Sequence, residues 1–403
     1  MNTPWLTVVG IGEDGTAGLS PAALTALMDA KLVFGGSRHL ALAGSAIHGK
    51  TQPWLTPFSA SIEAVLAAKG QKVCVLASGD PFHFGIGATL SRHVDPTQMR
   101  VIPHPSAFSL AAARLGWPLQ DIECLSLHGR PIDLIRPHLH PAARILALTS
   151  DEHGPAALAA LLAETGFGRS IVTVMEALGG QRERVRSQMA DSFALEDIDT
   201  LNICAVTVVP LPSARILPLA AGRDDALFEH DGQITKHEIR ALTLSALAPR
   251  RHEVLWDIGA GSGAVGIEWM LADSSLRTIA IEADSERAAR IGLNARAFGV
   301  PDLQVVEGTA PEALAGLAAP HAIFVGGGGT DQGVIDAAIA ALRPDGRLVA
   351  NAVTLEMEKA LLMLHAELGG ALTRIAVARA APLGDMTGWR PAMPITQWRW
   401  EKS

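Results

Sequence analysis

The sequence predicts an α/β protein built from two domains joined end to end, and three observations lead to this prediction. The same glycine spacing occurs twice, in Gly10–Gly15 and in Gly261–Gly266. Apolar, strand-like segments alternate with helical ones in both halves, as in α/β folds with largely parallel sheets. Three prolines and a glycine interrupt this alternation in residues 210–222. We therefore expect domains over residues 1–210 and 225–403, with 211–224 as a linker.

The predicted strands of the first half come from apolar runs bounded by turn residues. The helix after Ser20 has a serine cap and Pro21 at its first position. The strands are expected at Thr7–Gly10, Lys31–Phe34, Lys72–Leu76, Arg100–Ile102, Arg144–Leu148, Ile171–Val174 and Ile203–Val209.

The second half predicts one complete doubly wound domain of seven strands and intervening helices. Thr235 and Glu238 have the spacing of a capping box, which predicts a helix through about Ala248. A second helix is expected over Ser285–Phe298, stopped by Gly299. The strands are expected near Val254, Thr278, Leu303, Ala322, Arg347, Thr373 and Ile395.

Charge and composition limit the partners of this 403-residue chain. Its formal net charge of −8 argues against nucleic acid or an anionic membrane as the main partner. Residues Met1–Trp5 lack the basic start of a signal peptide, and no apolar run reaches the roughly 18 residues of a membrane span. We expect a cytoplasmic enzyme.

The cysteines and histidines show no metal-ligand spacing. Cys74, Cys124 and Cys204 each lie in or beside an apolar segment, so we interpret them as buried thiols in a reduced compartment. The fourteen histidines form no HxxxH or HExxH pair. We expect no metal site.

The second glycine string predicts a nucleoside site. A strand runs into Gly259, Gly261 and Gly263, and the next strand ends at Glu282, whose carboxylate can accept hydrogen bonds from both hydroxyls of a ribose. Asp257 would repel a pyrophosphate but could hold a cationic amino group. This favours S-adenosylmethionine over a nicotinamide cofactor. The alternative is that the glycines only form a tight turn.

Two further segments of the second half suggest a substrate surface. The run Gly326–Gly329, which includes Gly327 and Gly328, follows a strand and is typical of a wall that a bulky ligand approaches. Asn351 ends the next strand and could donate to that ligand. Its alternative role is that of a turn residue.

In the first half, the informative loop contains Gly79, Asp80 and Pro81 and directly follows a strand. Its carboxylate and open backbone suit a sulfonium ligand. The alternative is a surface turn over Phe82 and Phe84. His128 and Arg130 supply groups that could pair with substrate carboxylates, whereas Arg182–Arg186 is interpreted as a solvated charge run.

These segments resemble two known families. Val9–Gly12, Val33–Leu40, Ser78–Pro81 and Leu127–Arg130 resemble the tetrapyrrole (corrin/porphyrin) methylase family. Ile234–Arg240, Trp256–Gly263 and Asn351–Glu356 look like the decarboxylating precorrin methyltransferases of the class I fold. The order of the domains is similar to that of the fused precorrin methyltransferases of cobalamin biosynthesis. The resemblance implies a two-lobed tetrapyrrole methylase fold followed by a doubly wound, Rossmann-like class I methyltransferase fold.

The resemblance also implies a reaction. The chain would methylate a precorrin-6-type macrocycle at C5 in the first domain and at C15 in the second, and would remove the carboxyl group of the C12 acetate to give a precorrin-8-type product. Each domain would bind S-adenosylmethionine, and the chain would form a homo-oligomer.

The same resemblance assigns residues to ligands. In the first domain, the cofactor would lie beside Gly79-Asp80-Pro81, and the loop containing Gly10 and Gly12 would face the tetrapyrrole. Gly308, Thr309 and Ala310 lie where the family contacts adenine, although the family often has an acid in this segment. The remaining substrate-side positions are Arg38, His128, Arg130, Thr235, Gly327, Gly328 and Asn351.

No catalytic acid or base can be named from the sequence. Methyl transfer from a sulfonium mainly requires positioning, and a conjugated macrocycle can accept the electrons released by decarboxylation. Two other functions stay open at this stage. They are a nicotinamide-dependent oxidoreductase fused to a methylase, and a cofactor-binding regulatory module without catalysis.

Overall fold

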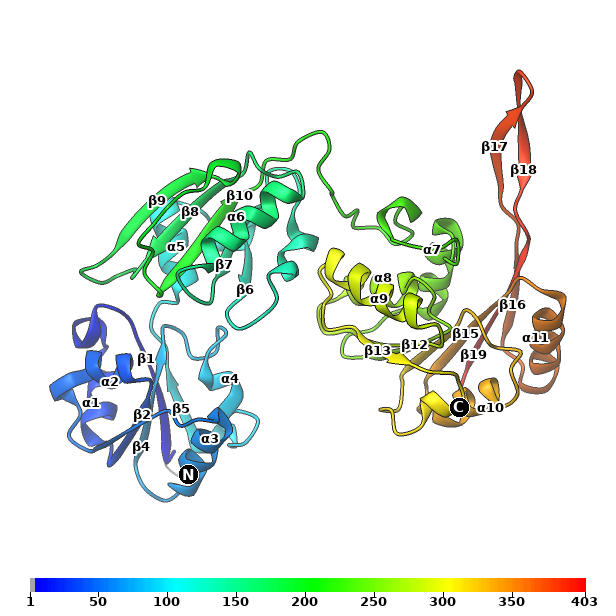
Figure 1. Cartoon of the computed structure of the whole chain (residues 1–403). Helices are drawn as coiled ribbons and strands as arrows, with labels where there is room; N and C mark the ends of the chain where they lie inside the picture. Colours follow the sequence, from blue (N-terminus) through cyan, green and yellow to red (C-terminus); the bar gives the residue numbers. More distant parts are fainter. Residues whose placement is uncertain (1–3) are drawn as a thin grey trace. The chain divides into compact units, whose positions relative to one another are not determined.

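The computed structural model describes residues 4–403, which divide into two compact units (Figure 1). Unit 1 comprises the residues up to Ile132 together with His138–Arg215, and unit 2 comprises Asp133–Pro137 and Ile216–Ser403. Residues 1–3 lie outside the described range, and they include part of the Met1–Trp5 segment that we expect not to be a signal peptide. No helix within residues 4–403 is long and apolar enough to cross a membrane.

Unit 1 begins with a parallel five-stranded sheet in the order β3-β2-β4-β1-β5. Both faces of the sheet are covered, since α3 and α4 pack on one face and α1 and α2 on the other. Helix α1 begins as predicted, with the Ser20 side chain accepting from the Ala23 N–H. The elements are β1 (Leu6–Ile11), α1 (Pro21–Asp29), β2 (Leu32–Gly35), α2 (Ser37–Ala43), β3 (Lys50–Pro53), α3 (Phe58–Ala67), β4 (Val73–Ser78), α4 (Ile86–Leu90) and β5 (Met99–Ile102).

The second sheet of unit 1 has the order β6-β7-β10-β8-β9, and only its β6–β7 pair is parallel. The expectation of largely parallel sheets is wrong here. The connection from β8 to β9 is short, and parallel pairing would need a long crossover. The elements are α5 (Ala107–Leu115), β6 (Glu123–Ser126), β7 (Arg144–Leu148), α6 (Gly154–Glu164), β8 (Ile171–Glu176), β9 (Arg184–Met189) and β10 (Asn202–Thr207).

The arginines of β9 are not the solvated charge run that we predicted. Arg184 Nε and Arg186 Nε donate to Glu176 Oε2 over 2.9 and 3.2 Å, and the Glu176 side chain is buried on the neighbouring strand β8. Because a buried carboxylate requires compensation, these arginines have a structural role.

Unit 2 contains a seven-stranded sheet in the order β13-β12-β11-β14-β15-β19-β16, in which β19 is antiparallel to its neighbours. Each predicted strand position matches one of these strands. Helices α7, α8 and α9 contribute to the core on one face, and α10 and α11 to the core on the other. The elements are α7 (His237–Leu247), β11 (Val254–Ile258), α8 (Ala264–Ala272), β12 (Arg277–Glu282), α9 (Ser285–Ala297), β13 (Gln304–Glu307), β14 (Ala322–Val325), α10 (Val334–Ala341), β15 (Arg347–Ala352), α11 (Leu355–Leu368), β16 (Ala371–Ile375) and β19 (Ile395–Glu401).

A two-stranded hairpin that was not predicted leaves this sheet between β16 and β19. It consists of β17 (Ala378–Leu383) and β18 (Met386–Pro391), and Figure 1 shows it extending clear of the sheet of unit 2. Its two strands are rich in alanine and proline and contain a single β-branched residue, Thr387, so the composition that marks strands is weak here. Trp389, which lies opposite Ala380 in the β17–β18 pairing, is 78% exposed.

A buried ionic network ties the start of unit 2 to its core. Arg240 Nε donates to Glu268 Oε1 over 2.8 Å, and both residues are buried. Glu268 also accepts from the Gly222 and Arg223 N–H groups. Residues 222 and 223, which were predicted to be linker, therefore pack as part of unit 2. Leu217 likewise belongs to its core.

The predicted capping box at Thr235 and Glu238 is wrong. Helix α7 starts after Lys236, and no side chain caps it. The Thr235 carbonyl accepts from Arg240, and Glu238 bonds Arg379 of the hairpin instead of reaching back. A hydrogen bond from Arg240 and a long-range ion pair with Arg379 have replaced the local motif.

Candidate functional site

Unit 1 contains a cavity of about 380 Å³, which we call the first cavity. It is lined by residues of both sheets of the unit, including the carboxyl end of β4 and the loop after β1. Four predicted site residues line it, namely Gly12, Arg38, Gly79 and His128. In an open α/β sheet, the carboxyl ends of the strands are where ligands bind.

Four other predicted residues of unit 1 do not line this cavity, and they are Gly10, Asp80, Pro81 and Arg130. A side chain at Gly10 would overlap the Gly79 carbonyl oxygen, so Gly10 allows two strand ends to approach each other. Asp80 Oδ1 accepts from the Phe82 N–H over 2.9 Å. The Pro81 carbonyl accepts from the Gly87 N–H over 2.8 Å. Asp80 and Pro81 thus shape the turn that presents Gly79, and Phe82 and Phe84 are exposed rather than packed beneath it.

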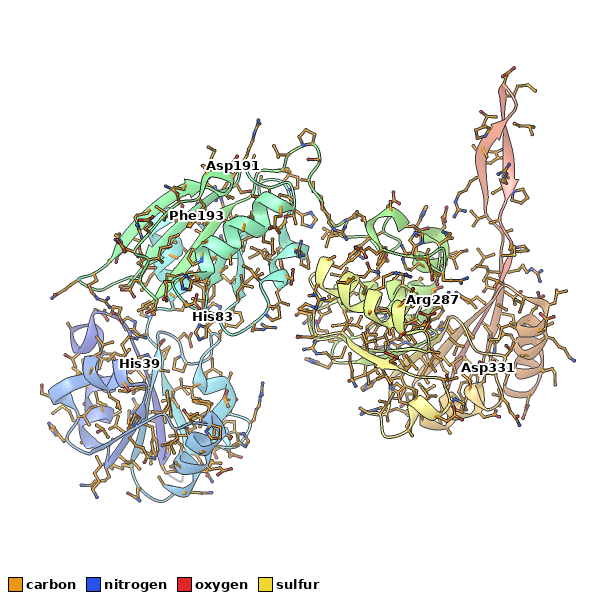
Figure 2. All side chains as sticks on the ribbon, viewed as in Figure 1. His39, His83, Asp191, Phe193, Arg287 and Asp331 are labelled. Atoms are coloured by element: carbon orange, nitrogen blue, oxygen red, sulfur yellow. The ribbon has the colours of Figure 1, made fainter. Side chains whose placement is uncertain are left out.

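Several residues that we did not predict also line the first cavity, among them Glu13, His39, Ser78 and His83. Figure 2 labels His39 and His83. Arg38 pairs with Glu13, and its Nη2 lies 2.8 Å from His39 Nε2 and 2.9 Å from Ser78 Oγ. His39, the residue after Arg38, therefore belongs to the same polar cluster as Arg38, Glu13 and Ser78.

The His39 imidazole is neutral at physiological pH. Its burial, and then the Arg38 guanidinium beside it, lower the pKa of His39 to about 4. Because Arg38 can only donate, His39 Nε2 accepts and the ring proton resides on Nδ1. The first cavity thus presents the Arg38 guanidinium paired with Glu13 and, beside it, the uncharged imidazole of His39.

Unit 2 contains a larger cavity of about 630 Å³, the second cavity. It lies at the carboxyl edge of the parallel strands, where the sequence predicted a nucleoside site. The predicted residues that line it are Thr235, Gly259, Gly261, Glu282, Gly308, Thr309, Ala310, Gly327, Gly328 and Asn351.

Backbone contacts orient Glu282 in this wall. Its Oε2 accepts from the Gly261 N–H over 2.7 Å, and its Oε1 accepts from the Asp284 N–H over 3.1 Å. Each carboxylate oxygen keeps a lone pair for another donor. Gly259 has a φ of +68°, and a Cβ there would lie 2.6 Å from the Gly327 carbonyl oxygen. The loop after β14 can approach this closely because Gly259 has no side chain.

Asp257 and Gly263 do not line the second cavity, which corrects the predicted contact between Asp257 and a cationic amino group. Asp257 is 1% exposed, and its Oδ2 accepts from the Gly266 N–H over 3.0 Å. Burial, with a further contribution from the Glu282 charge, raises the pKa of Asp257 to about 7. Asp257 therefore supports the glycine turn from below. A Cβ at Gly263 would meet Ile291 at 2.8 Å, so Gly263 serves helix packing.

A side-chain network that the sequence did not reveal holds Asn351. Its Nδ2 donates to Thr243 Oγ1 and its Oδ1 accepts from Gln397 Nε2, each over 2.9 Å. Gln397 lies opposite Asn351 in the antiparallel pairing of β15 and β19. The network explains why Asn351 presents one fixed face to the cavity.

Three cations that we did not predict line the second cavity, and they are Lys236, Arg287 and Arg379. Arg287 and the cavity-lining Asp331 are labelled in Figure 2. Each cation has an acidic neighbour, Asp225 for Lys236, Asp231 for Arg287 and Glu238 for Arg379. These side chains come from three separate elements, so no local motif signals them.

Comparisons with known proteins agree with the two-part organisation. A model of the tetrapyrrole (corrin/porphyrin) methylases matches residues 5–193, and a model of the precorrin methyltransferase domain matches residues 226–402. A precorrin-6Y C(5,15)-methyltransferase [decarboxylating] from Sinorhizobium sp is 62% identical over 99% of this chain and 97% of its own length.

Two shorter relatives each match less than half of the chain. The cobalt-precorrin-7 C(5)-methyltransferase of Salmonella typhimurium is 33% identical over 45% of this chain and 88% of its own length. The probable cobalt-precorrin-6B C(15)-methyltransferase (decarboxylating) of Pyrobaculum calidifontis is 39% identical over 43% of this chain and 94% of its own length. With a full-length relative at this identity, the chain belongs to the precorrin-6Y C5,15-methyltransferase (decarboxylating) family.

Proposed function

We propose that this chain is a bifunctional S-adenosylmethionine-dependent methyltransferase of cobalamin biosynthesis. It methylates a precorrin-6-type macrocycle at C5 and C15 and removes the carboxyl group of the C12 acetate, giving a precorrin-8-type product. The observation that carries the proposal is the presence of a separate cavity in each unit, each beside a glycine turn at the carboxyl end of a strand. The full-length relative, whose name states both methylations and the decarboxylation, supports it.

The second cavity suits S-adenosylmethionine. Glu282 offers carboxylate oxygens to ribose hydroxyls, while Gly259 and Gly261 leave backbone open for close approach. The adenine would lie against Gly308, Thr309 and Ala310. Asp257 would act only through the turn that it supports.

The first cavity would hold a second S-adenosylmethionine against Gly79, with the macrocycle facing Gly12, Arg38 and His128. Arg38 could pair with a substrate carboxylate, because a guanidinium fork fits one bidentately. It would have to share its charge with Glu13, the partner it has in this structure.

The residues of both cavities act mainly by positioning. S-adenosylmethionine supplies a methyl group on a positively charged sulfur. The cavity walls would position the substrate beside the methyl donor and exclude water. For decarboxylation, the walls of the second cavity would orient the acetate toward the conjugated ring, which accepts the electrons that remain when carbon dioxide leaves.

Each unit would carry its own reaction, residues 1–210 the C5 methylation and residues 225–403 the C15 methylation with decarboxylation. The two shorter relatives support this division, because one is named for C5 alone and the other for C15 with decarboxylation.

The experiment that tests the function uses the full chain with a precorrin-6-type substrate and S-adenosylmethionine. We expect two added methyl groups by mass and one released carbon dioxide. A thermal-shift titration with S-adenosylmethionine and with NAD addresses the oxidoreductase alternative, since a ligand at a hundred times its Kd stabilises its protein by about 2.7 kcal/mol. Stabilisation by NAD alone would contradict the proposal.

We also propose that the chain forms a homo-oligomer. The hairpin supports this, because its two short strands expose three large apolar side chains, those of Leu383, Met386 and Trp389, and exposed apolar surface often marks an interface. Light scattering on the purified chain tests it, and a monomer at micromolar concentration would contradict it.

A further inference from the structure

The order of strands separates the second cavity into two sides. The predicted cofactor residues follow β11, β12 and β13, whereas the base of the hairpin extends from β16 and β19. Strands β12 and β16 are five positions apart, or roughly 24 Å along the sheet at the usual strand spacing. The glycine loop after β14 lies between them. The hairpin side of the cavity is therefore distant from the side that Glu282 marks.

The wall on the hairpin side is apolar except for one guanidinium. Ile375, Val377, Met393 and Ile395 line it, and Arg379 is the charged hairpin residue among them. A tetrapyrrole has a flat apolar body with carboxylate side chains at its rim. An apolar wall with one fixed cation complements that chemistry.

Glu238 at the start of α7 fixes this guanidinium. Arg379 Nε donates to Glu238 Oε1 over 3.0 Å, and Nη2 donates to Oε2. Arg379 retains further N–H groups, including both on Nη1, for which no acceptor occurs among residues 4–403. The Arg379 side chain is 44% exposed, so a ligand in the cavity can reach these donors.

The other two cations of the cavity are less suited to this role. Arg287 lies on α9, which follows β12 on the cofactor side, and its Nε donates to Asp231 over 2.8 Å. Lys236 lies 3.6 Å from Asp225 and offers a point charge rather than a planar fork.

We propose that Arg379 is a specificity-determining residue of the second cavity, where its free N–H groups bind a carboxylate of the macrocycle while Glu238 holds the guanidinium in place. The inference rests on the proposed function for the class of substrate. It assigns the hairpin base to macrocycle recognition and leaves cofactor binding to the other side of the cavity.

Arg390 provides a matched control. It lies directly opposite Arg379 in the β17–β18 pairing, is also exposed, and does not line the cavity. In the full chain, we expect Arg379→Gln to raise the KM of the precorrin-6-type substrate for carbon dioxide release at least about tenfold, because a charge-assisted hydrogen bond is lost. Arg379→Lys should give a smaller increase, and Arg390→Gln none. The KM of S-adenosylmethionine and the C5 methylation should not change.

The inference is overturned if Arg379→Gln leaves the substrate KM unchanged, if Arg390→Gln raises it equally, or if Arg379→Gln weakens S-adenosylmethionine binding instead. Fluorescence-quenching titration with a porphyrin octacarboxylate gives a readout without turnover. If the wild type releases no carbon dioxide, the proposed function fails, and the inference is then judged by whether Arg379→Gln weakens macrocycle binding relative to Arg390→Gln.

Discussion

Replacing Glu282 by glutamine tests the candidate cofactor site most directly. Both carboxylate oxygens accept backbone N–H groups, from Gly261 and Asp284. Glutamine has only one oxygen, so its amide nitrogen must face one of these donors. The charge that would strengthen bonds to the ribose hydroxyls is lost as well. We expect S-adenosylmethionine binding to weaken by about 1–3 kcal/mol, or roughly five- to 150-fold.

Calorimetry on the full chain measures this effect. If each unit binds its own cofactor, S-adenosylmethionine affinity should fall at the second cavity and stay unchanged at the first. Glu307→Gln is the matched control, because Glu307 pairs with Glu282 in the register of β12 and β13 but is exposed and does not line the cavity. Unchanged affinity in Glu282→Gln, or an equal loss in Glu307→Gln, would refute the assignment of Glu282 to the cofactor site.

Three other predictions concern pH, the first cavity and the boundary between units. The pKa of Asp257 is raised to about 7, so the folded chain keeps a proton that the unfolded chain releases above about pH 4. The contribution of this proton to the free energy of unfolding is therefore full below about pH 4 and is lost as the pH rises to about 7. Urea unfolding should therefore show the stability of the wild type falling relative to Asp257→Asn between about pH 4 and 7, and parallel pH profiles would contradict this. Gly79→Ala places a Cβ 2.9 Å from the Pro105 carbonyl oxygen at a φ of +54°, so product mass should show loss of the C5 methyl group with decarboxylation retained. A segment of residues 225–403 lacks the Gly222 and Arg223 N–H groups, which donate to the buried Glu268 carboxylate. Thermal unfolding followed by circular dichroism should show this segment to be less stable than residues 216–403 by about 2–5 kcal/mol. Equal melting temperatures would contradict this.

Sequence periodicity predicted the seven strands of the large sheet of unit 2, but it missed β3, β6 and β9 of unit 1 and the β17–β18 hairpin. Strands β11, β12 and β14 are mostly apolar and almost wholly buried, because parallel strands are covered on both faces. The β17–β18 hairpin has no buried residue and only one β-branched residue, Thr387, so no pattern marked it. Its base nevertheless forms part of the second cavity.

The part of the second cavity that the backbone forms was predictable from the sequence. The glycines at 259 and 261 and the acid at 282 occupy positions that the strand–turn–helix order dictates, and all three line the second cavity. Asp257 was misplaced because sequence spacing does not reveal which face of the turn a side chain takes. Tertiary packing buried it beneath the turn.

The sequence by itself determined the α/β class, the family and the two glycine turns, because these depend on local periodicity, turn chemistry and motif order along the chain. Only the tertiary structure decided which charged side chains reach the cavities. Glu238 turned from a predicted cap to the partner of Arg379, which is 141 residues away, and Arg240 joined Glu268 in the core. The Arg240–Glu268 pair forms because burial removes water from a charge and makes the nearest opposite charge its best partner, wherever that charge lies in the sequence. The Glu238–Arg379 pair stays partly exposed, and it forms because the fold brings the hairpin base next to the start of α7.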